Sequence, residues 1–431
     1  MRLFALFFLL FASVANAQIT PPTNSQPVAA TSKVERIPAA RDIPYPGTLE
    51  ISLDTTDNLR GIFRVKQRVP VTAAGDLVML LPEWIPGNHK AAGEIGKISG
   101  IRFSAKGQPL RWERDSLNVY AFHIDVPAGV SNVDVEFQYI SATAGNQGRI
   151  VSTPEMQSIR WWSTSMYPAG YYVRNIPVRA SVTVPQGWTV AALRPMGQGQ
   201  GNRITFDPVS YQTLIDSPMT AGRNYRRIPL SPNVNLEVIA DTQAELAATP
   251  AQIAAHRRLV EQSRKLYGAE HFDHYDFLLT ISNSLGGAGL EHHRSSENGV
   301  GRGYFTDWEG ALSDRDLLPH EYVHSWNGKF RLGADSWTPD YRTPMQNSML
   351  WVYEGQTQFY GFVLAARSGM WSKQDALDAI ASISSLMLVA PVAWTSRLSR
   401  TFSGGMSPTT EPRWRWPVTT IVPASISSSS L

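Results

Sequence analysis

The sequence has no cysteine, and its 431 residues carry a formal net charge of only +3. Without cysteine the fold cannot depend on disulfides, a cysteine nucleophile is excluded, and any metal must be held by histidine and carboxylate side chains. No run of Lys and Arg provides the electrostatic footprint of nucleic-acid binding. Beyond the N-terminus, no stretch reaches the about 18 consecutive apolar residues of a membrane-spanning helix. These absences favour a globular protein that neither binds nucleic acid nor spans a membrane.

The N-terminus has the pattern of a secretory signal peptide over residues 1–17. Arg2 supplies the positive start, residues 3–12 are apolar, and residues 15–17 (Ala-Asn-Ala) form a small-x-small cleavage site. We therefore expect a secreted or periplasmic protein. Residues 18–43 are rich in Thr, Pro, Ser, Ala and Gln, which predicts a disordered linker.

Residues 44–231 alternate short apolar and polar runs between Gly, Pro, Asn and Asp, which predicts an all-β sandwich domain. The expected strands are Leu49–Leu53, Gly61–Val69, Asp76–Leu81, Val119–Val126, Val133–Ser141, Arg179–Val184 and Trp188–Leu193. The stiff aromatic loop at residues 82–87 is expected to be a packed corner rather than a substrate-facing loop. The aromatic residues between 161 and 172 are expected to pack in the core or between domains.

Residues 232–392 are expected to form a mainly helical second domain, followed by an irregular tail over residues 393–431. After a strand at Leu236–Ala240, the expected helix from Thr249-Pro250 to Gly268 is followed by a strand at Phe277–Ser282. Further helices are expected over 347–368 and 376–388.

The central motif of this second domain is His-Glu-x-x-His within Leu317–Asn327. On a helix, residues four apart share a face, so His320 and His324 can bind one zinc ion while Glu321 reaches the metal's water. Pro319 would lie in the first helical turn, where its missing N–H is tolerated. The alternative is a solvent-facing helix whose histidines have no function.

A second polar concentration follows the glycines at 286–289. Glu291, His292 and His293 stand directly after them. Two interpretations compete: His292 and His293 are metal ligands, or Glu291 faces a substrate.

Glu354 lies in a run of large apolar and aromatic residues on the expected helix 347–368. A carboxylate in such surroundings is costly unless it is paired or binds a metal. Glu354 is therefore the natural third zinc ligand, and a buried ion pair is the alternative.

The remaining histidines are expected to be structural or exposed. His256 lies on or beside the apolar face of its helix and is expected to be buried. His271, His274, His89 and His123 are expected at the surface.

Four motifs together resemble the secreted glycyl aminopeptidase family of zinc metallopeptidases. These are His320–Lys329 around the zinc helix, Leu350–Gly355 around the third ligand, Gly289–His292 upstream, and Trp84–Gly87 in the β domain. The likeness covers roughly residues 44–390. Family members have a thermolysin-like catalytic domain, so the resemblance implies a multi-domain α+β protein.

The resemblance also implies roles for individual residues. His320, His324 and Glu354 would bind Zn2+, and Glu321 would be the general base. Glu291, with Gly289 beside it, would meet the free N-terminal amine of a peptide. Trp326, Asn327 and Lys329 are candidates for supporting contacts, although packing explains them equally well.

These assignments predict a zinc-dependent aminopeptidase that favours small N-terminal residues such as Gly and Ala. Two imidazoles and one carboxylate leave an open metal position, where water is activated and the scissile carbonyl polarised. Glu321 would take the proton of the water and pass it to the leaving amine. The alternatives are a truncated, weak or inactive relative that binds peptides or partners, and an endopeptidase.

Two departures from the family bear on this prediction. Family members usually continue with more helices and a PDZ-like domain, whereas this sequence stops at Leu431. A frameshift or premature stop is our hypothesis for the tail, and the missing part would normally complete the catalytic domain and supply an oxyanion-stabilising tyrosine. After Trp84–Gly87 the usual Ser-Tyr is absent, which leaves the function of that loop open.

Overall fold

The computed structural model describes residues 34–191 and 201–389. The predicted signal peptide, residues 18–33 of the predicted linker and the predicted tail lie outside the described residues. From Ile37 onward, the described chain forms one compact unit. None of the described helices is both long enough and apolar enough to cross a membrane.

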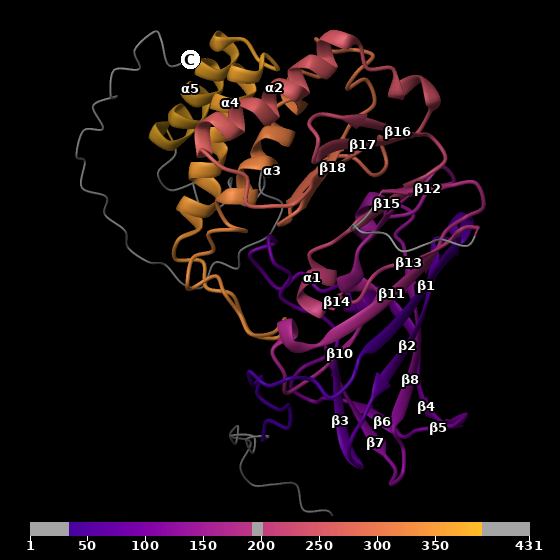
Figure 1. Ribbon diagram of the computed structural model, residues 1–431. Helices are drawn as coiled ribbons and strands as arrows, with labels where there is room; N and C mark the ends of the chain where they lie inside the picture. The colour runs from indigo at the N-terminus through magenta and orange to yellow at the C-terminus, as the bar shows by residue number, and fades with distance from the viewer. Residues whose placement is uncertain (1–33, 192–200, 390–431) are drawn as a thin grey trace, which may run out of the picture. The chain divides into compact units, whose positions relative to one another are not determined.

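The N-terminal part is β-rich, as predicted, and its largest sheet has the strand order β13-β11-β1-β2-β8-β4-β5, with β14 also pairing with β11 (Figure 1). Alternate residues of β8 are buried, namely Val133, Val135, Phe137 and Tyr139, as expected for a strand with one face on a core. The strands are β1 Leu49–Asp57, β2 Ile62–Pro70, β4 Ile98–Ala105, β5 Gln108–Pro109, β8 Asn132–Ile140, β11 Pro177–Thr183, β13 Arg203–Thr205 and β14 Val209–Ser210.

Two smaller sheets complete this part, with strand orders β10-β3-β7-β6 and β12-β15-β9. Both of these sheets share one apolar core with the eight-stranded sheet. Within this core, the rings of Phe103 in β4 and Phe122 in β7 lie 6.3 Å apart. The strands are β3 Gly75–Leu80, β6 Trp112–Arg114, β7 Ala121–Val126, β9 Met156–Ile159, β10 Tyr167–Pro168, β12 Thr189–Ala191 and β15 Met219–Gly222.

Each strand predicted from alternation in this part is present, with ends within a few residues of those predicted. Residues 192 and 193 of the predicted strand Trp188–Leu193 lie outside the described residues. The strands that were not predicted are β4, which has eight residues, and the shorter β5, β6, β9, β10, β13, β14 and β15. The two-residue strands among them, β5, β10 and β14, are too short to show a period. The predicted linker is too long: Ile37 is buried in the core, and Arg41 N–H donates to Gly170 O at 3.2 Å. The aromatic segment is core as predicted, since Trp161, Trp162 and Tyr167 are buried.

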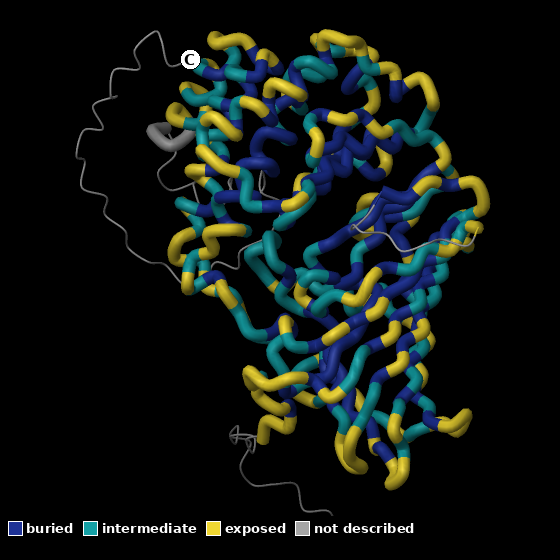
Figure 2. Tube along the Cα trace, in the orientation of Figure 1, coloured by how far each residue is buried: buried dark blue, intermediate teal, exposed yellow. Residues whose placement is uncertain are grey.

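The second part contains a five-stranded sheet as well as helices, with the order β16-β17-β18-β20-β19. β17, β18 and β20 are parallel, and all residues of β17 and β18 are buried, so helices or neighbouring strands cover both faces (Figure 2). The strands are β16 Tyr225–Pro229, β17 Val234–Ala240, β18 Tyr275–Ile281, β19 Ala288–Glu291 and β20 Ser295–Val300. The domain boundary at 231/232 stays a prediction, although β16, which precedes it, pairs with β17.

The helices of this part carry the predicted start signals. In α2, Thr249 and Gln252 form a reciprocal capping box and Gly268 ends the helix with φ 78°. Ser372 and Asp375 cap α5 in the same reciprocal way. The helices are α1 Tyr211–Ile215, α2 Pro250–Tyr267, α3 Leu317–Trp326, α4 Thr357–Ser368 and α5 Lys373–Val389.

The predicted helix 347–368 begins later than expected and starts as a π-helix. The π-helical segment η8 covers Trp351–Gln356 and leads into α4. Asn347 and Ser348 are drawn into loop contacts instead, because Asn347 Nδ2 donates to His89 O at 2.8 Å and Ser348 Oγ bonds Asp335. π-helical turns are rare and occur often at functional sites.

Candidate metal centre and active site

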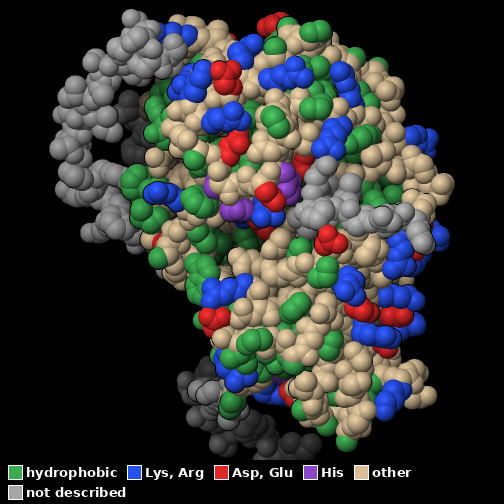
Figure 3. Space-filling view, viewed as in Figure 1, with side chains coloured by type: hydrophobic (Ala, Val, Ile, Leu, Met, Phe, Trp, Pro, Cys, Tyr) green, Lys and Arg blue, Asp and Glu red, His purple; other side chains and the backbone are tan. Residues whose placement is uncertain are grey.

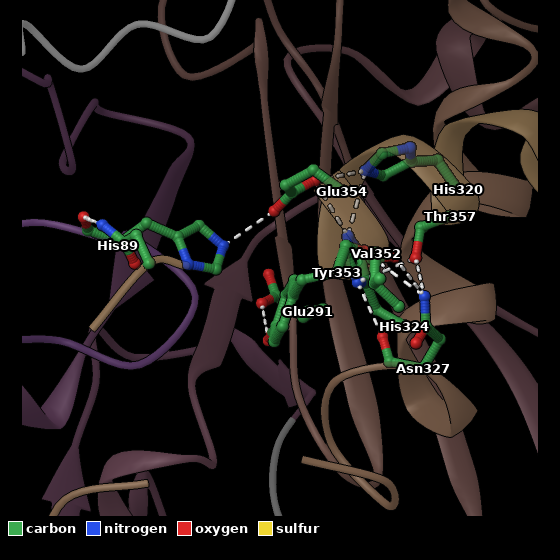
Figure 4. A network of polar contacts seen from close by, with 10 residues as sticks. His89, Glu291, His320, His324, Asn327, Val352, Tyr353, Glu354 and Thr357 are labelled. Carbon is green, nitrogen blue, oxygen red and sulfur yellow. Dashed lines mark hydrogen bonds and ion pairs between the residues drawn. The ribbon is translucent and has the colours of Figure 1, made fainter. Parts of the chain in front are cut away.

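Three side chains from two helical segments converge on one point. The Nε2 atoms of His320 and His324, both on α3, lie 3.1 Å apart. Glu354 Oε2, from η8, lies 3.5 Å from His320 Nε2 and 3.3 Å from His324 Nε2 (Figure 4). Histidine side chains also gather beside acidic side chains on the face seen in Figure 3. The predicted trio is therefore brought together in the folded chain.

The triangle of donor atoms has the size that zinc requires. Zinc binds histidine nitrogen and carboxylate oxygen at about 2.0–2.2 Å, so tetrahedral ligand atoms lie about 3.3 Å apart. The three observed separations, 3.1 to 3.5 Å, match this value. These residues thus fit a tetrahedral ion with one further position for water or substrate.

The tautomer of His324 also suits a metal ligand. Its Nδ1 lies 3.1 Å from Asn327 O and 3.3 Å from Thr357 Oγ1. A carbonyl accepts but cannot donate, so Nδ1 carries a proton. With a metal bound, Nε2 would give up its own proton and turn its lone pair to the ion, on the side of His320 and Glu354. Two facing imidazole nitrogens and a carboxylate oxygen form an acceptor-rich point that a cation would neutralise.

Negative charge is concentrated around this point. Glu291 and Glu321 lie with His324 in a second buried group whose ligand atoms are all within 4.8 Å of one another. The pKa of Glu321 is raised well above its usual range by burial, and the carboxylates of Glu291 and Glu354 raise it further. Burial opposes ionisation of Glu354 too, yet His324 and the hydrogen bonds around it hold its pKa well below the usual range.

The pKa of His324 is raised, whereas that of Glu354 is lowered. Burial lowers its pKa, but the carboxylates of Glu354 and Glu291 outweigh burial and raise the pKa to about 9. Three carboxylates therefore compete for the positive charge available in this pocket. Buried carboxylates are stable only when paired or bound to a metal, so the charge balance favours a divalent cation.

Glu321 is held against the glycine-rich segment before Glu291. A β-carbon at Gly289 in β19 would overlap Glu321 Oε1 and lie 2.8 Å from Leu317 Cδ1. Only glycine leaves room for the carboxylate here, which explains why Gly289 and Glu321 lie together.

Glu291 is buried next to the metal point, by which we mean the position between His320 Nε2, His324 Nε2 and Glu354 Oε2, and two other parts of the chain lie against it. The hydroxyl of Tyr353 donates to Glu291 Oε1. A β-carbon at Gly87 would lie 2.7 Å from the same oxygen. The pKa of Glu291 is lowered: burial opposes this, but His324 and Lys329 favour the carboxylate. Glu291 is thus an ionised group beside the metal point.

The loop at residues 82–87 is packed as expected, since Ile85 is buried in the core, but with the turn that follows it also reaches this site. Glu83 N–H and Trp84 N–H both donate to Tyr341 O, at 3.0 and 2.9 Å. The following turn places Gly87 against Glu291 and His89 Nε2 at 2.7 Å from Glu354 Oε1. His89 was expected at the surface, but its side chain is 14% exposed because it lies between Glu354 and the ring of Tyr353.

His292 does not join the metal point, and the interpretation of His292 and His293 as ligands is wrong for the described geometry. His292 is buried between Asp216, 3.2 Å from Nδ1, and Glu297, 3.5 Å from Nε2. Arg160 in turn pairs with Glu297 at 3.0 Å. His293 is half-buried and its backbone N–H donates to Asp216. The extended backbone turns Glu291 one way and His292 the other.

Other histidines also differ from expectation. His123 is buried, not exposed, because it bridges Asp76 and Asp115 at 2.8 and 2.9 Å. His271 is half-buried, with its ring stacked on Phe330. His256 is buried as predicted.

The last residue of α3 and the residues that follow it have separate roles. Asn327 Nδ2 donates to Val352 O at 2.8 Å and to Thr357 Oγ1 at 3.0 Å, so Asn327 joins α3 to η8 and α4. Lys329 Nζ pairs with Asp216 at 2.7 Å. Trp326 is a packing residue, stacked on Tyr267 with ring centroids 4.6 Å apart.

Sequence reasoning missed three residues of this site: His89, Tyr353 and Asp216. Tyr353 stands next to Glu354 and could have been suspected from that position. His89 and Asp216 are distant along the chain, and no local pattern marks them.

Comparison with known families gives two matches along the chain. Residues 50–223 match the peptidase M61 N-terminal domain, and residues 313–403 match the M61 glycyl aminopeptidase family. No curated protein matches the sequence.

Among solved structures, an aminopeptidase N family protein from Idiomarina loihiensis matches with a TM-score of 0.64 at 20% identity, over 77% of this chain. The matched part spans 56% of that protein, and the likeness shows a shared fold. An M1 zinc metallopeptidase mutant from Deinococcus radiodurans gives a TM-score of 0.46 at 13% identity, covering 81% of this chain and 75% of that one. Leukotriene A4 hydrolase from Saccharomyces cerevisiae gives 0.44 at 11%, covering 80% and 52%.

Proposed function

Because this chain belongs to the M61 glycyl aminopeptidase family, we propose that it is a zinc-dependent aminopeptidase that favours small N-terminal residues such as Gly and Ala. The observation that carries the proposal is the triangle of His320 Nε2, His324 Nε2 and Glu354 Oε2, with edges of 3.1 to 3.5 Å. These three residues would hold the ion. A bound zinc would lower the pKa of a water molecule and polarise the scissile carbonyl.

Glu321 is proposed as the general base. Its carboxylate lies within the buried group formed with Glu291 and His324, and burial raises its affinity for a proton. In the reaction it takes the proton from the attacking water and delivers it to the nitrogen of the leaving amine. Gly289 permits this position, because any side chain there would displace the carboxylate.

Glu291 is proposed to bind the protonated amino terminus of the peptide. Its pKa is lowered, so it offers negative charge at neutral pH, and the Tyr353 hydroxyl fixes one of its oxygens. A carboxylate at this place would select peptides with a free ammonium group and restrict cleavage to the first residue. This role would account for the third carboxylate, Glu291, beside Glu354 and Glu321.

The test is metal analysis of the purified chain combined with a substrate panel. We expect one zinc per chain and release of product from glycyl and alanyl chromogenic amides, but not from their N-acetylated forms. Glu321→Gln should retain zinc and lose activity by about 100-fold or more. Zinc-loaded protein on which Glu321→Gln has no effect would support the alternative, a secreted relative that binds peptides or partners. Cleavage of blocked peptides would indicate an endopeptidase.

We also propose that the protein is exported, on the pattern of residues 1–17. N-terminal sequencing of the protein from cell fractions should find a mature chain starting at Gln18 in the periplasm or medium. A chain that keeps Met1 and stays in the cytoplasm would contradict export.

A further inference from the structure

Glu354 uses its two oxygens for different purposes. Oε2 lies 3.5 Å from His320 Nε2 and 3.3 Å from His324 Nε2, whereas Oε1 lies 2.7 Å from His89 Nε2 (Figure 4). His89 belongs to the loop between β3 and β4 of the N-terminal β-rich part. One oxygen therefore faces the metal point and the other is tied to a distant segment.

The imidazole of His89 is held on several sides. Its backbone has φ 52°, a left-handed conformation that non-glycine residues adopt at a cost. Its carbonyl accepts from Asn347 Nδ2 at 2.8 Å, and its ring meets that of Tyr353 edge-on with centroids 4.6 Å apart. Such a conformation persists only when surrounding contacts over-determine it, and strained residues of this kind cluster at functional sites.

The loop that carries His89 is itself anchored next to the site. Trp84 N–H donates to Tyr341 O, Trp84 forms a β-bridge with Ala91, and Asn88 N–H donates to Ile85 O at 3.1 Å. Two of these contacts lie within the loop, so its turn is closed, and the first attaches it to the segment between α3 and η8. The histidine is thereby presented to Glu354 from a preformed turn.

We propose that His89 is a positioning residue for the metal centre: its Nε2–H donates to Glu354 Oε1 and keeps Oε2 directed at the ion. The inference rests on the proposed zinc function and adds to it a contribution from the β-rich part. A carboxylate ligand whose second oxygen is hydrogen-bonded is held in one orientation, and loss of such an outer partner typically weakens metal binding about 10–100-fold. Zinc binding and the docking of loop 82–92 therefore stabilise each other.

The test measures zinc affinity of the full chain by competition with a chromophoric chelator. We expect His89→Ala to bind Zn2+ about 10–100-fold more weakly than wild type. His89→Gln retains an N–H donor of similar reach and should restore the affinity to within a few-fold. Asn88→Ala, in the same turn, is the matched control and should bind zinc as wild type does.

A second readout separates positioning from a general effect on folding. The Co2+-substituted protein should show a visible absorption band that shifts in His89→Ala and returns in His89→Gln. Should His89→Ala fail to fold by circular dichroism, His89→Met, which keeps the bulk but has no donor, takes its place with the same expected losses.

The outcomes distinguish the two proposals. If the wild type holds one zinc, and if His89→Ala has the same zinc affinity and the same cobalt band as the wild type, the role of His89 is overturned. The proposed function then still stands. If His89→Gln binds zinc as weakly as His89→Ala does, the explanation by a hydrogen bond is overturned. A wild-type chain that binds no zinc overturns both.

Discussion

Gly289 and Glu321 lie so close together that a β-carbon on the glycine would overlap Oε1 of the carboxylate. We predict that Gly289→Ala displaces Glu321 and lowers kcat by about 100-fold or more, because general-base catalysis contributes about 10²–10⁴-fold. Zinc content should stay at one per chain, since the ligands lie on other segments. Steady-state kinetics with metal analysis checks this.

The matched control for that substitution is Gly145→Ala, where a β-carbon meets no atom within 4 Å. It should leave both kcat and zinc content unchanged. A Gly289→Ala enzyme with wild-type kcat would contradict the assignment of Glu321 as base.

Tyr353→Phe removes the hydroxyl that donates to Glu291 Oε1. A hydrogen bond to a charged group contributes about 1.5–3 kcal/mol, so we expect KM for unblocked glycyl substrates to rise about tenfold. Tyr360→Phe on α4 is the control and should leave KM unchanged. An unchanged KM for unblocked substrates in Tyr353→Phe would argue against amine binding by Glu291.

Metal removal should abolish activity and lower stability together. A ligand that binds only the folded state at 100 times its Kd stabilises it by about 2.7 kcal/mol, so dialysis against a chelator should lower the Tm and zinc should restore it. His324→Ala should lose this response. His271→Ala, which alters a half-buried histidine that contacts Ser325 of the same helix, should keep it. A zinc-induced shift that survives in His324→Ala would place the ion elsewhere.

The ion pair between Lys329 Nζ and Asp216, at 2.7 Å, is largely buried. Burial would raise the pKa of Asp216, but Lys329 and His292 outweigh it and hold the pKa well below its usual range. Removing one partner of a buried pair costs about 3–5 kcal/mol, so Lys329→Met should lower the free energy of unfolding by about that amount. Urea unfolding of both single variants and of Lys329→Met/Asp216→Asn checks this. The double variant should be less destabilised than the sum of the two, and simple additivity would contradict the pairing.

His256 predicts a pH dependence of stability. Burial lowers its pKa to about 4, against about 6.5 in an unfolded chain, and the ring is fixed between Gln252 O and Tyr304 Oη at 2.8 and 3.0 Å. Because the folded pKa is depressed, this contribution is intact above pH about 6.5 and is lost as pH falls towards 4, by up to about 3 kcal/mol.

Urea unfolding of wild type and His256→Gln at pH 7, 5.5 and 4 measures that effect. The variant cannot titrate at this position, so its free energy of unfolding should fall less steeply with acid than that of wild type. Identical slopes would contradict the lowered pKa of His256 in the folded protein.

Much of the fold could be predicted because its signals are local. The alternation of β8 places Val133, Val135 and Phe137 on one face, and a strand follows from any such period. Thr249-Pro250 and Gly268 mark the ends of α2 by their own backbone preferences. Two-residue strands such as β5 carry no period, and partners elsewhere in the chain define them.

The sequence alone determined the part of the site that a single helical turn contains. His320 and His324 share a face of α3 because four residues make about one turn, and the apolar surroundings of Glu354 marked it as a third candidate. It also determined that cysteine ligands and disulfides are excluded.

Only the tertiary structure decided what completes the site. His89 and Glu354 are 265 residues apart, and their contact exists because a loop of the β-rich part is anchored on the segment after α3. The different roles of Glu291 and His292 were likewise decided by tertiary structure. Glu291 faces the metal point, whereas His292 faces the buried carboxylates of Asp216 and Glu297. Distant contacts leave no mark in local composition or period, because they arise only when separate elements pack against one another.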